Sequence, residues 1–181
     1  MIQFILLGFL NYQPMTGYDL KQIIDESSGH FWHAYHSQIY TTLRKMEQDG
    51  LVTSQFVQED SSPDRRIYTI TPSGQASLKT WLDKTLTERS PIKEELLVRI
   101  FFSAQRDPQE VLSELRLQRG LHQEKAAAYQ AIGMHLSAEV IPHEGLERDK
   151  KFWQLTLNMG MRYEQMYIAW LDDSIKTIEA L

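Results

Sequence analysis

Short apolar runs separated by turn residues fill the first part of the chain and predict small, closely spaced elements. Ile2–Leu10 is apolar on most sides, which indicates a mostly buried helix that ends at Asn11–Pro14. A second helix is expected over Gly17–Asp25, because Thr16 is a favourable residue for capping a helix N-terminus. The inner face of this helix would carry Leu20, Ile23 and Ile24.

A third helix is expected to open at His36 or Ser37. Its apolar side chains recur at i, i+4 and i+7, a spacing that places them on one face: Ile39, Leu43 and Met46. Gly50 stands where a glycine commonly follows the end of a helix. The pattern therefore predicts a 13- or 14-residue amphipathic helix over 36–49.

A hairpin and a fourth helix are predicted next. Leu51–Val57 and Arg65–Ile70 have strand-like composition, and Gln58–Asp64 between them is rich in turn residues. Thr71 is followed by Pro72 at the first helical position, and the helical pattern continues to about Leu86. The order is helix, helix, helix, hairpin, helix.

Longer helical patterns fill the second part of the chain. Lys93–Ser103 is a short apolar helix, and Asp107–Pro108 starts a long one that extends to about Ala138. A final helix over Leu146–Ala180 would be roughly 50 Å long. Its large apolar side chains occupy more than one face, so we expect it to be covered on two sides.

The polar segment Thr87–Pro91 separates the two parts, and Pro91 disfavours helical structure at the residue before it. We expect a domain over 1–86, a linker over 87–92 and a helical domain over 93–181. The predicted fold class is mainly α with a small β-hairpin: a winged helix-turn-helix joined to a coiled-coil-like helical domain.

The charge balance excludes proteins that hold nucleic acid by bulk positive charge. The 181 residues include 19 basic and 24 acidic ones, which gives a formal net charge of −5. Residues 1–90 contain 8 basic and 10 acidic residues, leaving 11 and 14 for the remainder, so neither part is basic overall. A small local basic surface remains compatible with these counts.

Candidate chemistry is sparse. The chain has no cysteine, which excludes disulfide scaffolds, thiolate zinc sites and thiol nucleophiles. It carries no nucleophile elbow, phosphate-binding glycine loop or paired metal-binding histidine motif, so we expect neither enzyme activity nor a cofactor. His30, His33 and His36 are spaced by three, but the aromatic segment between them favours a packing loop over a metal site.

The apolar segment Ile2–Leu10 lacks the basic flank and cleavage site of a secretory signal, and it is too short to span a membrane. We therefore expect a cytoplasmic protein with no membrane partner.

Three helices followed by a hairpin are typical of a winged helix-turn-helix, in which the third helix enters the DNA major groove. Short hydroxyl and amide side chains on helix 36–49 can approach base edges, while Arg44 and Lys45 suit phosphates. Arg65 and Arg66 alternate along a strand of the wing, 58–66, so only one can face DNA, and Arg65 is nearer the tip. The candidate DNA-binding residues are Ser37, Gln38, Tyr40, Thr41, Thr42, Arg44, Lys45, Arg65, Arg66 and Tyr18.

Three blocks resemble a known family. Gln38–Val52 is similar to the recognition-helix signature of the PadR-like transcriptional regulators. Met15–Leu20 and Arg65–Gly74 are similar to the motifs that flank this signature in the family. The blocks follow the family's order and spacing over residues 4–86. The long helical tail resembles the AphA-like subgroup, which has an extended C-terminal domain.

The resemblance implies a homodimeric, ligand-responsive regulator, usually a repressor, that binds a pseudo-palindromic operator. Its partners would be double-stranded DNA, a second copy of the chain and a small aromatic or hydrophobic effector. In the family, the tyrosine that matches Tyr40 lies at the DNA surface, and the C-terminal helices form the dimer interface.

Two features depart from a strongly basic DNA-binding surface. The wing tip carries three acids, Glu59, Asp60 and Asp64, and the third helix sets Glu47 and Asp49 against its two basic residues. We expect modest DNA affinity that depends steeply on salt.

Residues of the final helix have the composition of an adaptable binding surface. They could line a ligand pocket or form the core and dimer interface, and the second interpretation is favoured: Trp153, Leu157, Met159, Tyr163, Met166, Tyr167 and Trp170. Two other functions remain open, a winged-helix protein-interaction module without DNA binding and a helical protein that sequesters a small molecule.

Overall fold

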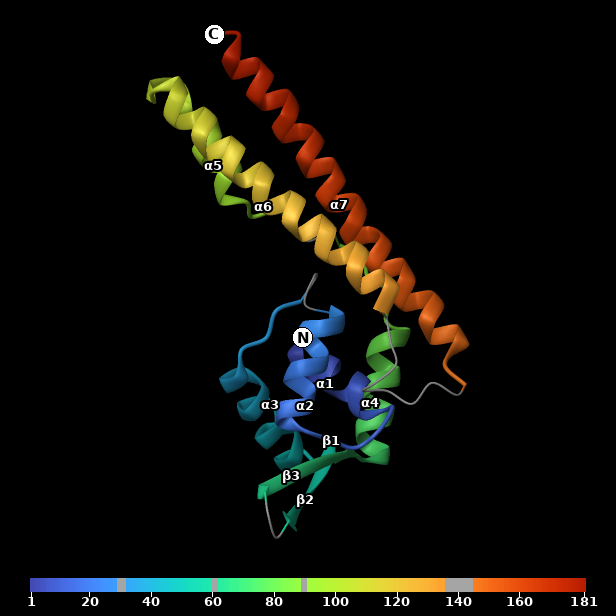
Figure 1. Cartoon of the computed structure of the whole chain (residues 1–181). Coiled ribbons are helices and arrows are strands. Elements are labelled where there is room, and N and C mark those ends of the chain that lie inside the picture. Colours follow the sequence, from blue (N-terminus) through green and yellow to red (C-terminus); the bar gives the residue numbers. More distant parts are fainter. Residues whose placement is uncertain (29–31, 60–61, 89–90, 136–144) are drawn as a thin grey trace. The chain divides into compact units, whose positions relative to one another are not determined.

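Residues 1–28, 32–59, 62–88, 91–135 and 145–181 are described by the computed structural model (Figure 1). They divide into two compact units, one formed by residues 1–87 and the other by the described residues from 88 onward. The first unit contains α1 (Ile2–Leu10), β1 (Met15–Thr16), α2 (Gly17–Ile23), a π-helical turn (Ile24–Ser28), α3 (His36–Gln48), β2 (Val52–Glu59), β3 (Ser62–Ile70) and α4 (Pro72–Asp83). The second contains α5 (Glu95–Phe101), a 3₁₀ turn (Ser103–Gln105), α6 (Pro108–His135) and α7 (Glu147–Glu179).

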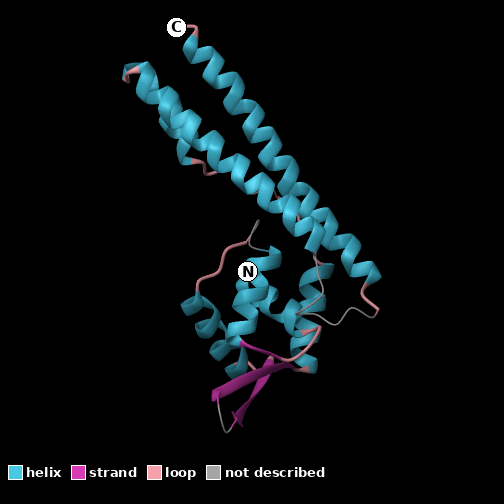
Figure 2. Ribbon diagram, in the orientation of Figure 1, coloured by secondary structure: helices cyan, strands magenta, loops and turns pink. Residues whose placement is uncertain are grey.

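The predicted fold class is confirmed: helices dominate both units, and the described strands form one small antiparallel sheet in the first unit (Figure 2). Two of the helix starts follow from residues that the sequence indicates, Thr16 before α2 and Pro72 at the start of α4. The Thr16 hydroxyl accepts a hydrogen bond from the Asp19 backbone N–H at 3.1 Å, and the Asp19 carboxylate accepts one from the Thr16 N–H at 3.0 Å. The Thr71 hydroxyl likewise accepts a hydrogen bond from the Gly74 N–H at 3.1 Å, with Pro72 at the first position of α4.

Several helix ends differ from their predicted positions. The α4 helix ends at Asp83 rather than near Leu86, because Lys84 already has an extended backbone with φ −78° and ψ 118°. The α-helical part of α2 ends at Ile23 and continues as a π-helical turn. The α5 helix is shorter at both ends than Lys93–Ser103. The predicted end of the long helix, 136–138, lies outside the described residues.

The sheet has the order β1-β3-β2, and β1 was not predicted. The predicted turn over Gln58–Asp64 is wrong in length, because β2 and β3 remain paired out to Glu59 opposite Ser62. An antiparallel ladder satisfies backbone groups whatever the polarity of the side chains, so a polar sequence does not end it. The register shifts between Val57 and Glu59, opposite Pro63, and β1 pairs only with Ile67 and Tyr68; a proline is tolerated at such an irregular position with a single neighbouring strand.

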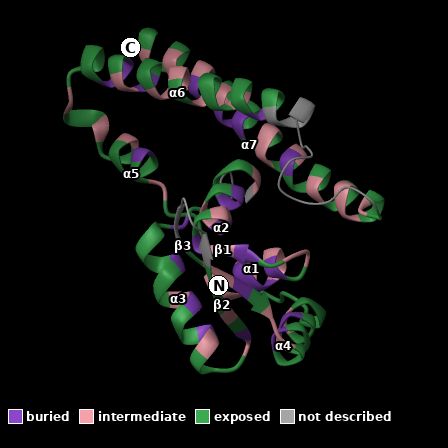
Figure 3. Ribbon diagram, turned by 60° about the horizontal axis from the view of Figure 1, so that its bottom comes forward, coloured by how far each residue is buried: buried purple, intermediate pink, exposed green. Residues whose placement is uncertain are grey.

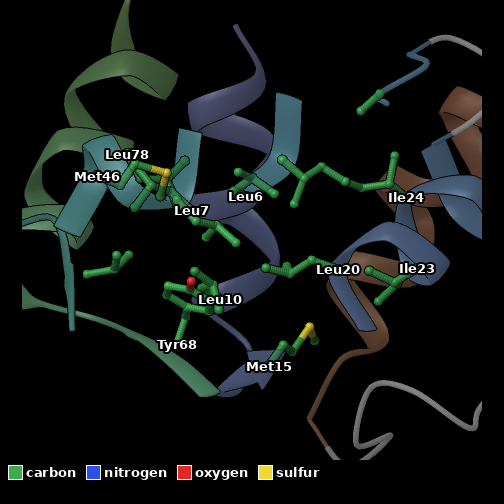
Figure 4. Close-up of a cluster of buried hydrophobic side chains, with 14 residues drawn as sticks. Leu6, Leu7, Leu10, Met15, Leu20, Ile23, Ile24, Met46, Tyr68 and Leu78 are labelled. Carbon is green, nitrogen blue, oxygen red and sulfur yellow. The ribbon is translucent and has the colours of Figure 1, made fainter. Parts of the chain in front are cut away.

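The core of the first unit lies between its helices and the sheet. Leu6, Leu7 and Leu10 of α1 are at most 2% exposed, and they pack with buried residues of α2, α3, β3 and α4 (Figure 4). Phe4 stacks on Trp81 with ring centroids 4.7 Å apart, which joins α1 to α4. This core holds α3 with one face inward.

The second unit is built on the antiparallel pair α6 and α7. Ion pairs that run in opposite chain directions define the orientation: Arg116 with Glu179, and Arg119 with Asp172. The buried cluster of this unit joins both helices to α5 and contains Leu96, Val111, Leu115, Tyr167 and Leu171. Among the residues that the structure describes, no helix is both long enough and apolar enough to cross a membrane.

A close backbone approach at Gly74 generates the first prediction. A Cβ atom at this position would lie 2.2 Å from the Leu51 carbonyl oxygen, which already accepts a hydrogen bond from the Thr71 N–H at 3.0 Å. Gly74→Ala is therefore expected to lower the free energy of unfolding by about 3 kcal/mol, measured by urea denaturation. Gly8→Ala is the matched control, because nothing lies within 4 Å of its Cβ position in α1 and alanine favours helix. If Gly74→Ala were as stable as the unmodified chain, the close packing of α4 against Leu51, just before β2, would be contradicted.

Candidate nucleic-acid interface

The α3 helix presents one face to the core and the other to solvent (Figure 3). Ile39, Leu43 and Met46 are all 0% exposed, as the sequence predicts. Gly50 follows the helix with φ 70°, a left-handed conformation that favours glycine and turns the chain into β2. The helix is therefore fixed about its own axis, and its remaining side chains form an outward surface.

The predicted base-contacting and phosphate-contacting residues lie on this outward surface. Within the helix these residues are exposed, apart from Thr42, which is half-buried: Ser37, Gln38, Tyr40, Thr41, Arg44 and Lys45. Near the start of the helix, Ser37, Gln38, Thr41 and Thr42 line a hollow of about 450 Å³ together with Met1, Ile2 and Trp32. The polar N-terminal half and the basic C-terminal half suit base edges and phosphates respectively.

Tyr40 lies against the first turn of α2. A Cβ atom on Gly17 would be 2.5 Å from Cε1 of the Tyr40 ring, so the ring occupies the space that any larger side chain at position 17 would need. Tyr40 is nevertheless 42% exposed, and Tyr18, the residue after Gly17, is 64% exposed. Tyr40 thus both packs on the neighbouring helix and presents part of its surface outward.

The two wing arginines occupy opposite faces of β3. Arg65 is opposite Val57 and is exposed, whereas Arg66 is opposite Phe56 and is half-buried. The Arg66 guanidinium turns toward α3, where Nη2 lies 2.5 Å from Oε2 of Glu47. DNA contact by either arginine stays a prediction. Of the acidic tip, Asp60 lies outside the described residues.

Glu47 and Ser54 form contacts that the sequence did not predict. The Ser54 hydroxyl donates to Oε1 of Glu47 at 2.5 Å and accepts from Nε of Arg66 at 2.8 Å. The pKa of Glu47 is lowered chiefly by the Ser54 hydrogen bond; desolvation opposes this shift, and Arg66 adds to it. The carboxylate is therefore charged at neutral pH.

Two of the three closely spaced histidines lie among the described residues. His33 and His36 are exposed, and the His33 ring lies edge-on to Tyr35 at 5.0 Å. His30 lies outside the described residues. Within the described ranges, no group of three or more histidine and acidic side chains is placed to hold a metal ion.

The seven candidate residues of the final helix separate into two sets. Leu157 and Tyr167 are buried, and Trp153 and Trp170 are half-buried. Tyr163 and Trp170 approach the Tyr167 ring at 5.8 and 5.3 Å, and burial raises the pKa of Tyr167 to about 12. The exposed set is Met159, Tyr163 and Met166. A hollow of about 380 Å³ in this unit is lined by other residues, among them Ile100, Arg106, Val111 and Ile178.

A buried acidic residue in α7 was also not predicted from the sequence. Glu164 is 2% exposed and its Oε2 contacts Nδ1 of His122, whose ring stacks on Tyr167 with centroids 4.0 Å apart. The spacing in the sequence could have indicated its burial, because Glu164 lies seven residues from both Leu157 and Leu171 and shares their buried face.

Comparisons with known proteins agree with this architecture. Residues 6–80 match the Transcriptional regulator PadR-like family, and residues 92–179 match the Virulence activator alpha C-term family. The Negative transcriptional regulator PadR of Bacillus subtilis is 27% identical over 178 residues, covering 98% of this chain and 97% of the relative.

Solved structures share this fold over nearly the full length of the chain. The crystal structure of Bacillus subtilis PadR in complex with operator DNA has a TM-score of 0.84 at 25% identity, with 98% of each chain covered. The same protein in complex with p-coumaric acid has a TM-score of 0.78 at 27% identity and the same coverage. The Vibrio cholerae virulence activator AphA shares the fold, with a TM-score of 0.76, 24% identity and 99% of each chain covered.

The contact between Tyr40 and Gly17 generates a second prediction. Gly17→Ala is expected to push the Tyr40 ring outward and to weaken binding to a duplex selected from random sequences by about tenfold, because a misplaced ring disturbs the outward face of α3. Fluorescence anisotropy measures the affinity, and urea denaturation checks that stability changes little. Gly120→Ala in α6, where nothing lies within 4 Å of the Cβ position, is the control. Unchanged affinity of Gly17→Ala would exclude a role of the Tyr40 position in binding.

Proposed function

Because the chain belongs to the PadR-like family of transcriptional regulators, we propose that it is a homodimeric, ligand-responsive repressor that binds a pseudo-palindromic operator. The observation that carries the proposal is the division of α3 into a fully buried apolar face and an exposed polar one. A winged helix needs this arrangement to place side chains in the major groove while the helix stays attached to the core.

The charge distribution supports recognition by a small surface. Arg44 and Lys45 are exposed on α3, while Glu47 on the same helix is paired with Arg66. The negative charge of Glu47 is therefore compensated within the protein and opposes the approach of phosphates less than an unpaired acid would. Two such surfaces in a dimer would bind two half-sites about one helical turn apart, which multiplies the effect of a modest single contact.

A second copy of this chain is the partner that the exposed apolar surface of α7 fits. Five side chains spaced by three or four residues form a stripe with exposures between 41% and 65%: Phe152, Leu155, Met159, Tyr163 and Met166. A long exposed apolar stripe marks an interaction surface, and long paired helices are a common dimerisation element. We name these five residues the α7 stripe.

We further propose that a small aromatic compound acts as effector. The relative PadR has been crystallised with p-coumaric acid, which supports this class of ligand for a chain that shares its fold over nearly its whole length. An effector can change operator binding only if it binds the two dimer geometries with different affinity. The aromatic side chains around Tyr167 supply surface of matching chemistry.

For the organisation of the chain, we propose a DNA-binding domain over 1–86, a linker over 87–92 and a helical dimerisation domain over 93–181. The division of the described residues after Thr87 supports this arrangement. A repressor acts where its operator is, so we propose a cytoplasmic location.

Selection from random duplexes tests the DNA-binding proposal. The expected result is an inverted-repeat motif, bound with an affinity whose logarithm falls linearly with the logarithm of salt concentration, at a slope of about −0.9 per phosphate contacted. The triple variant with alanine at Tyr40, Arg44 and Lys45 is expected to lose binding by at least about 100-fold.

The control for this experiment removes two positive charges away from α3, by alanine at Lys79 and Lys84, and is expected to bind normally. Recovery of no duplex would favour the protein-interaction module or the sequestering protein instead. Binding that survives the triple substitution would show that α3 is not the recognition helix.

Sedimentation velocity tests the dimer. Glutamate at both Leu155 and Met159 is expected to convert dimers into monomers, because it places charges in the centre of an apolar interface. The matched control places glutamate at Gln154 and Gln165, which are exposed on α7 but outside the α7 stripe. Dimers that persist with both stripe substitutions would assign the interface to another surface.

A further inference from the structure

One arginine of the wing faces inward and joins three elements. Nε of Arg66 donates to the Ser54 hydroxyl at 2.8 Å, and Nη2 donates to Oε2 of Glu47 at 2.5 Å. The Ser54 hydroxyl donates to Oε1 of Glu47 at 2.5 Å. The three side chains close a ring of hydrogen bonds between α3, β2 and β3, and both oxygens of the carboxylate are used.

Aromatic rings hold the guanidinium in place within this ring of bonds. The Arg66 guanidinium carbon lies 5.2 Å from the centroid of Phe56 and 5.4 Å from that of Tyr68. The strand register explains this, because Arg66 is opposite Phe56, and Ser54 is opposite Tyr68, on one face of the hairpin. The planar fork of arginine fits such a site in a way that a lysine ammonium does not.

The ring of bonds gives the wing a second point of attachment to α3. The first attachment is at the base of the hairpin, where the Thr71 hydroxyl donates to the Gly50 carbonyl oxygen at 2.7 Å. The hairpin is also held where β3 pairs with β1 at Ile67 and Tyr68, so any swing of the wing would begin beyond these two residues. The bond from Glu47 to Arg66 lies one residue nearer the tip and ties β3 directly to α3, which fixes the angle between the wing and the helix.

We infer that Glu47 and Arg66 are positioning residues that set the wing at a defined angle to the recognition helix, and that Arg66 does not itself neutralise a DNA phosphate. This inference rests on the proposed DNA-binding function. The charge of Arg66 is already matched by Glu47, whereas Arg65 on the opposite face is exposed. Wing and helix then approach DNA as one rigid surface, and their combined fit depends on an acidic residue.

The sign of the Glu47→Gln effect on affinity tests the inference. An acid that merely lies near DNA would repel phosphates, so its neutralisation would tighten binding. Neutralising a positioning acid would instead weaken binding. We expect Glu47→Gln and Arg66→Gln each to weaken binding about tenfold, and the double variant to be no weaker than either single variant. Arg66→Lys should be equally weak although it keeps the charge. Lys79→Gln, which removes one charge from α4, is the control and should bind normally.

The salt dependence of binding separates positioning from phosphate contact. The slope of log affinity against log salt should be unchanged in Arg66→Gln, because no counterion release is lost. A slope reduced in magnitude by about 0.9 in Arg66→Gln, near-normal binding of Arg66→Lys, or tighter binding of Glu47→Gln would each overturn the inference.

A measurement without DNA tests the attachment of the hairpin separately from the proposed DNA-binding function. Amide hydrogen exchange in Val52–Val57 of the full chain should accelerate at least about fivefold in Glu47→Gln and remain unchanged in Lys79→Gln. If the unmodified chain binds no duplex, the proposed function fails, and the exchange rates still decide whether the pair holds the hairpin. Unchanged exchange in Glu47→Gln would overturn the inference.

Discussion

The burial of one face of α3 is the constraint on which the rest of the structure depends. Ile39, Leu43 and Met46 are completely removed from solvent, and each such side chain contributes about 1.5–3 kcal/mol when it is buried. Rotation of the helix about its axis would expose them, so the orientation of the outward polar face follows from the inward apolar one. The helices around α3 provide the surface against which these three side chains are buried, and the wing is attached at its C-terminal end.

Features that depend on a few neighbouring residues could be predicted from the sequence. The capping of α2 by Thr16 and of α4 by Thr71 involves partners three residues away, and the left-handed Gly50 follows from the end of one helix. The apolar spacing in α3 identified its buried face and therefore most of the candidate site. The family motifs added the role of the region, because they are defined by the same local segments.

Features that depend on distant residues could not be predicted. Glu47 and Arg66 are 19 positions apart and meet only because the register of β2 and β3 places Ser54 and Phe56 beside them. The two-residue strand β1 is too short to carry a pattern, and it pairs with Ile67 and Tyr68, which are distant in the sequence. A count of charges alone misjudges Glu47. From the sequence it was expected to oppose the two basic residues of its helix, whereas in the structure it is paired with Arg66.

The contact between the buried Glu164 and the half-buried His122 limits how the helical unit can move. It joins α7 to α6 at a place where Glu164 is 2% exposed and lies on the same face as Leu157 and Leu171. A slip of one helix along the other by a single turn, about 5.4 Å, would separate the two side chains and leave a buried carboxylate without its partner. Sliding is therefore costly, and the contact favours movements in which α6 and α7 keep their positions along one another.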